Sequence, residues 1–590
     1  MFRWAGAVYN GNYEADGEDR SCRGYRRRGE FTRVKKTSSI IMTAALVVGL
    51  LAGCSSGKEE GPAASSAQPS SSGAETTGET NAFGWVKPGQ TTVIDFYQAD
   101  RDNPDKVARD TVRLHDYLLA NFNVDLKKTV YDVDPKERLN LMLASGEYPE
   151  VIAAMDDDTV DKWKAQGKII DLTSYVDQYG QNIKKALGDK YKTYLDEEGK
   201  LWGLPRGWGY LPGPDFTAHI RLDWYEELGS PKIETPEDYY GVLKQMVAAH
   251  PTNAQGEKVY ALSWNDQVNI NNVMGIWGLK DGYKEDADHN LTHWLNTSEG
   301  LEAARFYNQV YRDGLLDPDL FINKFDDWKT KFTNERIIGH IGSWWQSWNA
   351  GHEIWRNTVA DYQDDMRYVQ IAIKAADAEA AYLSPKDARG WNYTVLTDKV
   401  KNPEAIIKFL DFTMSPMGTR LLGWGVPNEE DSLWNYEEDG KWSFNEAQKT
   451  ALLDGTFDYE KADQLGGNRY WLVHGQGLLD DDNKSTAWYD QNFIEEDKWK
   501  KLMYDNTKDT IYDNTARRVV FSVDNPYTLV NQQIEDLVKN GFAQAVTRKT
   551  EDELVNTFND LRDKANKLGL QDLEKYRTEE YKKQLAILNQ

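Results

Sequence analysis

The chain has 590 residues, of which 70 are Lys or Arg and 95 are Asp or Glu, so its formal net charge is −25. A protein this acidic would repel the phosphate backbone, and we therefore expect no nucleic-acid partner. A chain of this length exceeds what one hydrophobic core organises, which predicts two or more domains. Its two cysteines, Cys22 and Cys54, provide no disulfide framework.

The N-terminal part is interpreted as a leader that ends at residue 53. Residues 1–33 mix charges and glycines without periodicity, and we interpret them as untranslated, with the true start near Val34. The run from Ile40 to Ala52 is uncharged and shorter than the ~20 apolar residues that span a bilayer. Two lysines before this run and small residues after it predict a signal peptide over residues 34–53.

The end of this leader resembles a bacterial lipoprotein signal. Leu51-Ala52-Gly53 is followed directly by Cys54. The resemblance implies that the Cys54 thiol is lipidated and that this residue becomes the mature N-terminus. The alternative is a buried N-terminal helix with an incidental cysteine. Residues 54–82 favour the lipidated form, because this Ser-, Gly- and Ala-rich tract cannot bury enough surface to fold and is predicted to be a disordered tether.

Strands and helices are predicted to alternate after the tether. The first strand is expected near Thr91–Ala99, and a helix is expected over Lys106–Ala120. An extended piece at Val124–Leu126, a helix end at Arg138–Ala144 and an apolar strand at Pro149–Ala154 follow. This alternation predicts an α/β domain with a largely parallel sheet.

Six segments of the chain carry a resemblance to a known family. They are 139–152 (LNLMLASGEYPEVI), 171–187 (DLTSYVDQYGQNIKKAL), 196–207 (DEEGKLWGLPRG), 220–246 (IRLDWYEELGSPKIETPEDYYGVLKQM), 317–345 (DPDLFINKFDDWKTKFTNERIIGHIGSWW) and 402–425 (NPEAIIKFLDFTMSPMGTRLLGWG). In this order they resemble the family 1 extracellular solute-binding proteins of ABC importers, the maltose-binding-protein-like group. The length and the C-terminal extension are most similar to large lipoproteins of this family from Gram-positive bacteria.

The resemblance implies a two-lobe, type II periplasmic-binding-protein-like α/β fold with the ligand cleft between the lobes. Mapping the matched segments assigns residues 91–207 and 337–390 to lobe 1. Residues 208–336 and 391–590 are assigned to lobe 2.

The same mapping implies where the chain passes between the lobes. Crossovers are expected near Gly207–Asp215, near Ile337 and near Gly390. The C-terminal helical stretch from Glu551 to Ile587 is expected to extend the second lobe.

The sequence carries little sign of catalysis or metal binding. It contains no GxSxG, HExxH or CxxC motif and no Gly-rich phosphate loop, so we expect no catalytic residue and no cofactor. Several large relatives are known for a calcium-site-like loop after the helix that corresponds to Glu237–Ala249. Here the equivalent loop, His250–Tyr260, keeps one carboxylate, Glu257, whereas calcium needs six to eight oxygen ligands. We therefore predict no metal there.

Tryptophans are the candidate ligand-binding residues. The chain has 21 of them, and many stand beside Gly or polar residues. An indole offers a flat apolar surface to a sugar ring at a small entropic cost. Core packing is the alternative for any single Trp. Trp208, Trp344, Trp345 and Trp391 fall where the lobes should face each other and are predicted to bind the ligand.

Three further residues complete the predicted site. Asp156 follows a predicted strand end, and Asp266 stands two residues after Trp264. Both carboxylates are expected to accept hydrogen bonds from ligand hydroxyls, with Trp264 beside them.

These observations predict a monomeric, lipid-anchored receptor on the extracellular face of the membrane of a Gram-positive bacterium. It would bind an oligosaccharide and deliver it to the transmembrane subunits of an ABC permease. The alternatives are an oligopeptide receptor, a secreted polysaccharide-active enzyme, and a surface adhesion module without transport.

Overall fold

The computed structural model describes residues 78–99, 112–131, 134–209, 215–387, 389–437, 440–457, 465–467, 470–521 and 525–589. The leader, Cys54 and most of the tether lie outside these residues. The described part from Gly78 onward groups into one compact unit. None of its helices is long and apolar enough to cross a membrane.

The first lobe is built on a five-stranded sheet in the order β2-β1-β3-β12-β4. β1 pairs in parallel with β2 and β3, and β12 runs antiparallel to β3 and β4. The strands are β1 (Thr92–Gln98), β2 (Val124–Thr129), β3 (Val151–Met155), β4 (Leu204–Arg206) and β12 (Asn392–Leu396). The parallel part confirms the predicted strand–helix alternation, because helices at Val112–Phe122 and Pro135–Ser145 separate these three strands.

Helices surround the first sheet, and half of those described here begin at side-chain caps. Asp134 caps α3, Asn402 caps α14 and Ser415 caps α15, each accepting a backbone N–H of the first turn. The helices are α2 (Val112–Phe122), α3 (Pro135–Ser145), α4 (Asp157–Ala165), α5 (Thr173–Tyr179), α6 (Gln181–Leu187), η1 (Gly188–Tyr194), α14 (Pro403–Thr413) and α15 (Pro416–Trp424).

Further segments of the first lobe follow α15. They contribute Trp434, Leu472 and Phe493 to the same core. The elements are β13 (Trp434–Tyr436), β14 (Trp442–Phe444), α16 (Glu446–Leu453) and η6 (Tyr489–Phe493).

The second lobe is built on a four-stranded sheet in the order β10-β5-β9-β6. β5 is antiparallel to β10 and β9, and β6 is parallel to β9. The strands are β5 (Phe216–Arg221), β6 (Tyr260–Ser263), β9 (Ile337–Ser343) and β10 (Tyr368–Ile371). β5 is buried along its whole length. The hydrophobic core of the second lobe is a cluster of buried residues separate from the core of the first lobe.

The helices of the second lobe come from two parts of the chain. Its elements before β10 are α7 (Leu222–Glu227), α8 (Pro236–Ala249), α9 (Ile270–Val273), η2 (Met274–Trp277), β7 (Tyr283–Glu285), β8 (Leu291–His293), η3 (Trp294–Asn296), α10 (Ser298–Arg312), α11 (Phe325–Thr333), α12 (Trp344–Ser347), η4 (Trp348–His352) and α13 (Glu353–Thr358). The C-terminal elements are α18 (Lys498–Thr507), η7 (Lys508–Thr510), η8 (Thr515–Arg517), α19 (Thr528–Val546), α20 (Glu551–Leu568) and α21 (Leu570–Leu588).

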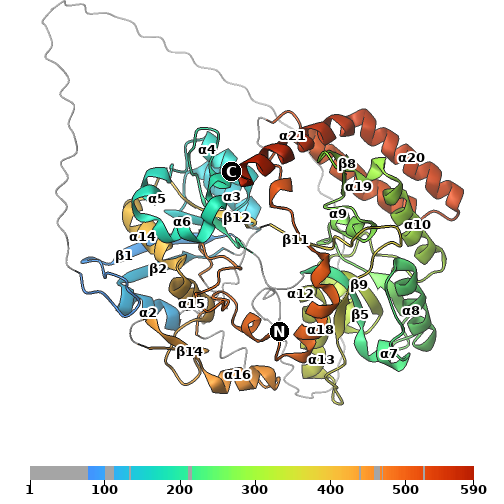
Figure 1. The fold of residues 1–590 in the computed structure, drawn as a ribbon, viewed down its shortest axis with the longest axis horizontal. Helices are drawn as coiled ribbons and strands as arrows, with labels where there is room; N and C mark the ends of the chain where they lie inside the picture. Colours follow the sequence, from blue (N-terminus) through green and yellow to red (C-terminus); the bar gives the residue numbers. More distant parts are fainter. Residues whose placement is uncertain are drawn as a thin grey trace, which may run out of the picture. The chain divides into compact units, whose positions relative to one another are not determined.

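The predicted C-terminal helical stretch is therefore two helices, separated at Gly569, whose φ of 108° ends α20. Leu554, Phe558 and Leu573 join the core of the second lobe, as expected. α21 also contacts η1 of the first lobe. Figure 1 shows the blue and teal elements of the first lobe on the left, the green elements of the second lobe on the right, and β11 (Ser384–Lys386) between them.

The lobe boundaries differ from the expected ones at two places. Residues 337–390 were expected in lobe 1, but β9 pairs residue by residue with β5 and so belongs to the second sheet. Residues 391–590 were expected in lobe 2, but β12 completes the first sheet between β3 and β4. The chain then stays in the first core as far as Phe493 and returns to the second lobe with α18.

The chain thus crosses between the lobes three times. The first crossing joins β4 to β5 over residues 207–215, as expected. The second joins β11 to β12 near Gly390, also close to a predicted position. The third lies between η6 and α18, and the crossing expected near Ile337 is wrong because this residue starts a central strand of the second sheet. β11 pairs in parallel with β15 (Ile511–Asp513) beside the second crossing.

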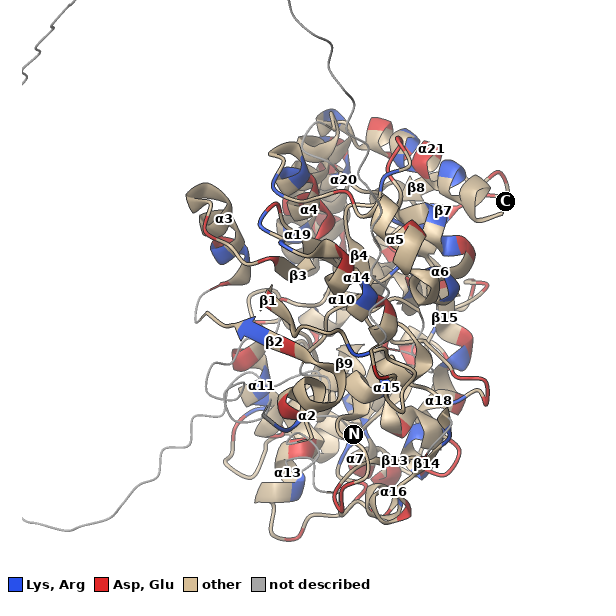
Figure 2. Ribbon diagram, turned by 90° about the vertical axis from the view of Figure 1, so that its left-hand side faces the viewer, with Lys and Arg blue, Asp and Glu red and all other residues tan. Residues whose placement is uncertain are grey.

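Residues 78–82, the last part of the predicted tether, belong to the described residues, and Asn81 contacts the first lobe. The Asn81 side chain accepts hydrogen bonds from Phe83 and Trp85 and donates one to the Asn121 carbonyl. Trp85 then packs against Phe122. Figure 2 shows Lys and Arg interspersed with Asp and Glu over the helices, without a continuous basic face in that view.

Candidate functional site

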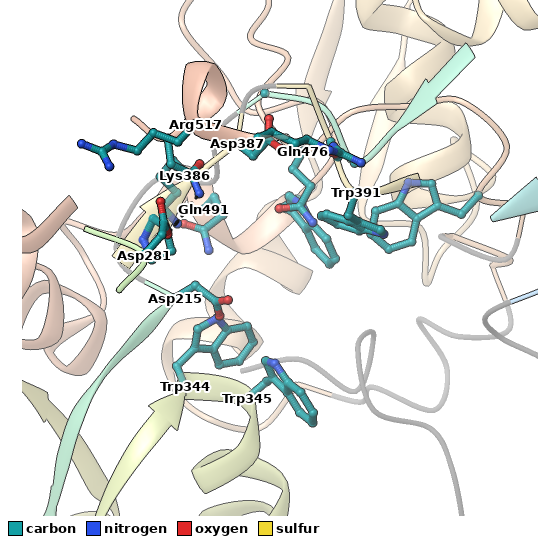
Figure 3. A pocket seen from close by; sticks show the side chains of 18 residues that line it. Asp215, Asp281, Trp344, Trp345, Lys386, Asp387, Trp391, Gln476, Gln491 and Arg517 are labelled. Atoms are coloured by element: carbon teal, nitrogen blue, oxygen red, sulfur yellow. Dashed lines mark hydrogen bonds and ion pairs between the residues drawn. The ribbon is translucent and has the colours of Figure 1, made fainter. Parts of the chain in front are cut away.

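A cavity of about 640 Å³ lies where the two lobes and the crossing segments meet. Its wall takes residues from the first lobe, from the second lobe and from the β11–β15 pair. They are Gly207, Gly209, Asp215, Asp281, Trp344, Trp345, Pro385, Lys386, Asp387, Gly390, Trp391, Trp471, Gln476, Trp488, Gln491, Asn514, Arg517 and Arg518. Figure 3 shows that Trp344 and Trp345 lie on one side and Trp391 on another.

Five tryptophans line this cavity, contributed by both lobes. Trp344 and Trp345 open α12 directly after β9, where Ser343 and Gln346 form a capping box that fixes the start of the helix. Trp344 packs against Trp471 and Trp488 of the first lobe. The indoles therefore form an apolar contact from one lobe to the other.

Trp391 is the most accessible of the predicted aromatic residues, with 46% of its surface exposed. Its ring lies edge-on to that of Trp471, with 5.6 Å between centroids. Gly207 lies directly under the indole, since a Cβ there would stand 2.5 Å from the Trp391 ring. The absence of a side chain at Gly207 thus leaves room for the Trp391 indole. The exposed face of this indole can contact a ligand.

Charged and amide side chains occupy the rest of the wall. Asp215, just before β5, accepts a hydrogen bond from the Ser343 hydroxyl at 3.4 Å. Burial raises the pKa of Asp215, and the charge of Lys386 opposes that shift. Asp281 accepts a hydrogen bond from Tyr512 at 2.7 Å, and burial raises its pKa as well. The cavity therefore combines flat apolar surfaces with hydrogen-bonding groups.

Two arginines reach the cavity from the segment after β15. Arg517 forms an ion pair with Glu285 of the second lobe. Arg518 pairs with Asp157, at the start of α4 in the first lobe, and with Asp387 at 3.2 Å. Arg518 thus connects the first lobe with the second crossing.

The structure brings Trp344, Trp345 and Trp391 together in this cavity, but it does not bring Trp208 there. Trp208 is 4% exposed and belongs to the core of the first lobe. Its indole N–H donates to the Val473 carbonyl at 2.8 Å. The glycines on either side of Trp208 line the cavity while its own side chain turns away from it.

Asp156, Trp264 and Asp266 also lie elsewhere. Asp156 is exposed and caps α4 by accepting the backbone N–H of Thr159 at 2.8 Å. Trp264 and Asp266 line a separate cavity of about 300 Å³ in the second lobe. Asp266 forms an ion pair with Lys324 at 2.9 Å.

Sequence reasoning missed most of the polar wall and two of its indoles. Trp471 and Trp488 follow the late helix pair in a stretch with no periodic pattern, and Arg517 and Arg518 follow the short strand β15. The only available signal was the same one used for the other tryptophans, an aromatic residue beside polar or small neighbours.

The loop His250–Tyr260, where no metal is predicted, is stabilised by hydrogen bonds of the Asn253 side chain. Asn253 accepts the backbone N–H groups of Gln255 and Glu257 and donates to the Asn334 carbonyl at 2.8 Å. Across the described ranges, no group of three or more His, Cys, Asp or Glu side chains has the geometry to hold a metal ion.

Two curated proteins are similar to this chain in sequence. The chain is 22% identical over 366 residues to the fructooligosaccharide ABC transporter substrate-binding protein FusA of Streptococcus pneumoniae, covering 58% of this chain and 65% of FusA. It is 25% identical over 207 residues to lipoprotein LipO of Bacillus subtilis, covering 34% and 40% of the two chains. The chain thus matches less than two thirds of the length of these curated relatives. No protein-family model matches it.

Solved structures match over more of the chain. An S. pneumoniae FusA EF-hand mutant in complex with fructo-nystose superposes with a TM-score of 0.63 at 17% identity, covering 84% of this chain and all of FusA. The alginate-binding protein AlgQ2 gives a TM-score of 0.61 at 16% identity, covering 86% of this chain and all of AlgQ2. These matches show that the chain shares the two-domain α/β fold of FusA and AlgQ2.

Proposed function

We propose that this chain is the extracellular substrate-binding protein of an ABC importer and that it binds an oligosaccharide in the cavity between its lobes. One observation carries the proposal: five indoles from both lobes surround a cavity that also presents carboxylates, amides and a lysine. Sugar rings stack on indoles through their C–H faces, and their hydroxyls pair with such polar groups.

A ligand that contacts both lobes would favour closure of the two lobes around it. A ligand shifts an open–closed equilibrium only by binding one state better than the other. A sugar between Trp391 of the first lobe and Trp344 of the second would touch both only when the lobes are close together. FusA, a fructooligosaccharide ABC transporter substrate-binding protein, has the same fold.

Anchoring and delivery complete the proposal. Cys54 would carry the lipid, and the Ser-, Gly- and Ala-rich tract behind it would hold the binding lobes away from the membrane. The permease subunits would receive the sugar on the outer face of the membrane, from a receptor acting as a monomer. We infer no enzymatic activity, because FusA is a substrate-binding protein.

A glycan panel read by thermal shift tests the function. A ligand at a hundred times its dissociation constant stabilises the folded state by ~2.7 kcal/mol. Oligopeptide mixtures form the comparison arm, and product analysis of each glycan detects turnover. A shift with peptides alone, or cleavage of a glycan, would contradict the proposed function in favour of a peptide receptor or an enzyme.

A further inference from the structure

Lys386 is a buried cation that lines the cavity, and within the described ranges its ammonium group has no hydrogen-bond or ion-pair partner. It ends β11, lines the cavity and is 8% exposed. Among the residues that the structure describes, no acceptor lies within hydrogen-bonding distance of its Nζ atom and no carboxylate within 4 Å. Figure 3 shows the side chain among Arg517, Gln491 and Asp281 at the edge of the cavity.

The other cations of the wall differ from Lys386 in this respect. Arg517 is paired with Glu285, and Arg518 is paired with both Asp157 and Asp387. Their charges are therefore neutralised within the protein. A ligand does not need to supply an anion to either arginine.

Two acids of the cavity wall, Asp215 and Asp281, form no ion pair with Lys386. Asp215 is its main electrostatic partner but forms no ion pair with it, and Asp281 is held by Tyr512. Burial lowers the pKa of Lys386, with the Asp215 charge opposing that shift. Asp215 and Lys386 thus both border the open space that a ligand would fill.

The ammonium group of Lys386 has lost part of its hydration, and no ion pair with a described residue compensates for that loss. A neutral hydroxyl would restore one hydrogen bond but no opposite charge. A carboxylate would restore both, and charge-assisted hydrogen bonds are the stronger kind. The unpaired lysine therefore favours an anionic group on the ligand.

We propose that the oligosaccharide bound here is acidic and that a uronic-acid carboxylate pairs with the Lys386 ammonium group. This inference rests on the proposed sugar-binding function and narrows it to one substrate class. The indoles of Trp344 and Trp391 would hold the ring faces. A carboxylate at the ring edge would then reach the wall at β11.

Matched ligands and matched variants test this. The ligands are oligouronides of the galacturonic, glucuronic and mannuronic/guluronic series, each paired with its carboxyl-reduced neutral counterpart. The proteins are the wild type, Lys386→Met, Lys386→Arg and the control Lys232→Gln, which removes an equal charge from a side chain that is 78% exposed. Affinity is measured by calorimetry, with folding of each variant checked by circular dichroism.

The wild type is expected to prefer at least one oligouronide over its neutral counterpart by about tenfold or more, as charge-assisted contacts do. Lys386→Met should abolish this preference, Lys386→Arg should retain part of it, and Lys232→Gln should leave it unchanged. Because the wild type alone reveals the preference, a poorly folding variant does not remove the test.

Two outcomes would overturn the inference, and they are distinguishable. If the wild type binds neutral glycans as tightly as oligouronides, or Lys386→Met weakens both equally, the lysine binds hydroxyls and only the acidic substrate class fails. If the folded wild type binds no glycan of either kind, the proposed sugar-binding function fails with it.

Discussion

Replacing Trp391 by Ala removes an aromatic surface from the cavity with little effect on the core. An indole side chain buries about 200 Å² when fully covered, so an exposed fraction of 46% leaves roughly 90 Å² for a ligand. At ~25 cal/mol per Å² of apolar surface, covering this area contributes about 2 kcal/mol. We therefore expect Trp391→Ala to weaken binding of an identified glycan roughly thirtyfold.

Calorimetry on the folded variant measures this change, and Trp224→Ala is the matched control. Trp224 stacks on His250 with 4.0 Å between ring centroids and does not line the cavity. The control should keep wild-type affinity. Near-wild-type affinity in Trp391→Ala, together with Trp344→Ala, would refute the assignment of these indoles to the ligand.

Four further predictions concern stability, pH, anchoring and metals. Trp208→Ala should lower the free energy of unfolding by about 3 kcal/mol or more, because its indole is buried in the first core; an unchanged urea midpoint would contradict this. Burial lowers the pKa of His340 to about 4, below the ~6.5 expected for an unfolded chain. The unfolded chain therefore binds a proton at His340 before the folded protein does. Below pH 6.5 this lowers the free energy of unfolding by about 1.4 kcal/mol per pH unit as the pH falls toward 4, and above pH 6.5 it has no effect. Urea unfolding at several pH values should show a shallower decline in His340→Gln than in the wild type, and parallel curves would exclude this histidine as a source. Cys54→Ser should release the protein from membranes in detergent-free washing without unfolding it, and continued membrane association would refute lipidation. Treatment with EDTA should leave glycan affinity unchanged, because the Asn253 loop is closed by its own hydrogen bonds; loss of affinity that calcium restores would reveal a metal site.

The type of fold could be predicted from the sequence, but the partners of individual strands could not. β1, β2 and β3 follow one another with intervening helices, so their order and type show in the local pattern. β9 and β12 are both largely buried strands, and their composition does not indicate to which sheet each belongs. Only the register of β9 with β5 and of β12 with β3 decides this, and such pairing depends on residues far away in the sequence.

The same limit explains which site residues could be predicted. Trp344 begins α12 directly after β9 and Trp391 directly precedes β12; both line the cavity, where the sequence predicted ligand-binding residues. Trp208 has a similar sequence context, but its side chain turns into the core while Gly207 and Gly209 face the cavity. The direction of one side chain in an irregular crossing depends on what packs around it, here the Val473 carbonyl and Gly475.

Contact of α21 with both lobes has a consequence for handling this protein. The helix packs on β8 of the second lobe and also contacts η1 of the first, so the last residues of the chain take part in holding one lobe against the other. A purification tag or a shortened C-terminus would therefore change how readily the lobes separate while leaving every cavity residue in place. Affinities measured on such derivatives would differ from the native value, and a fluorophore near residue 584 would report lobe movement directly.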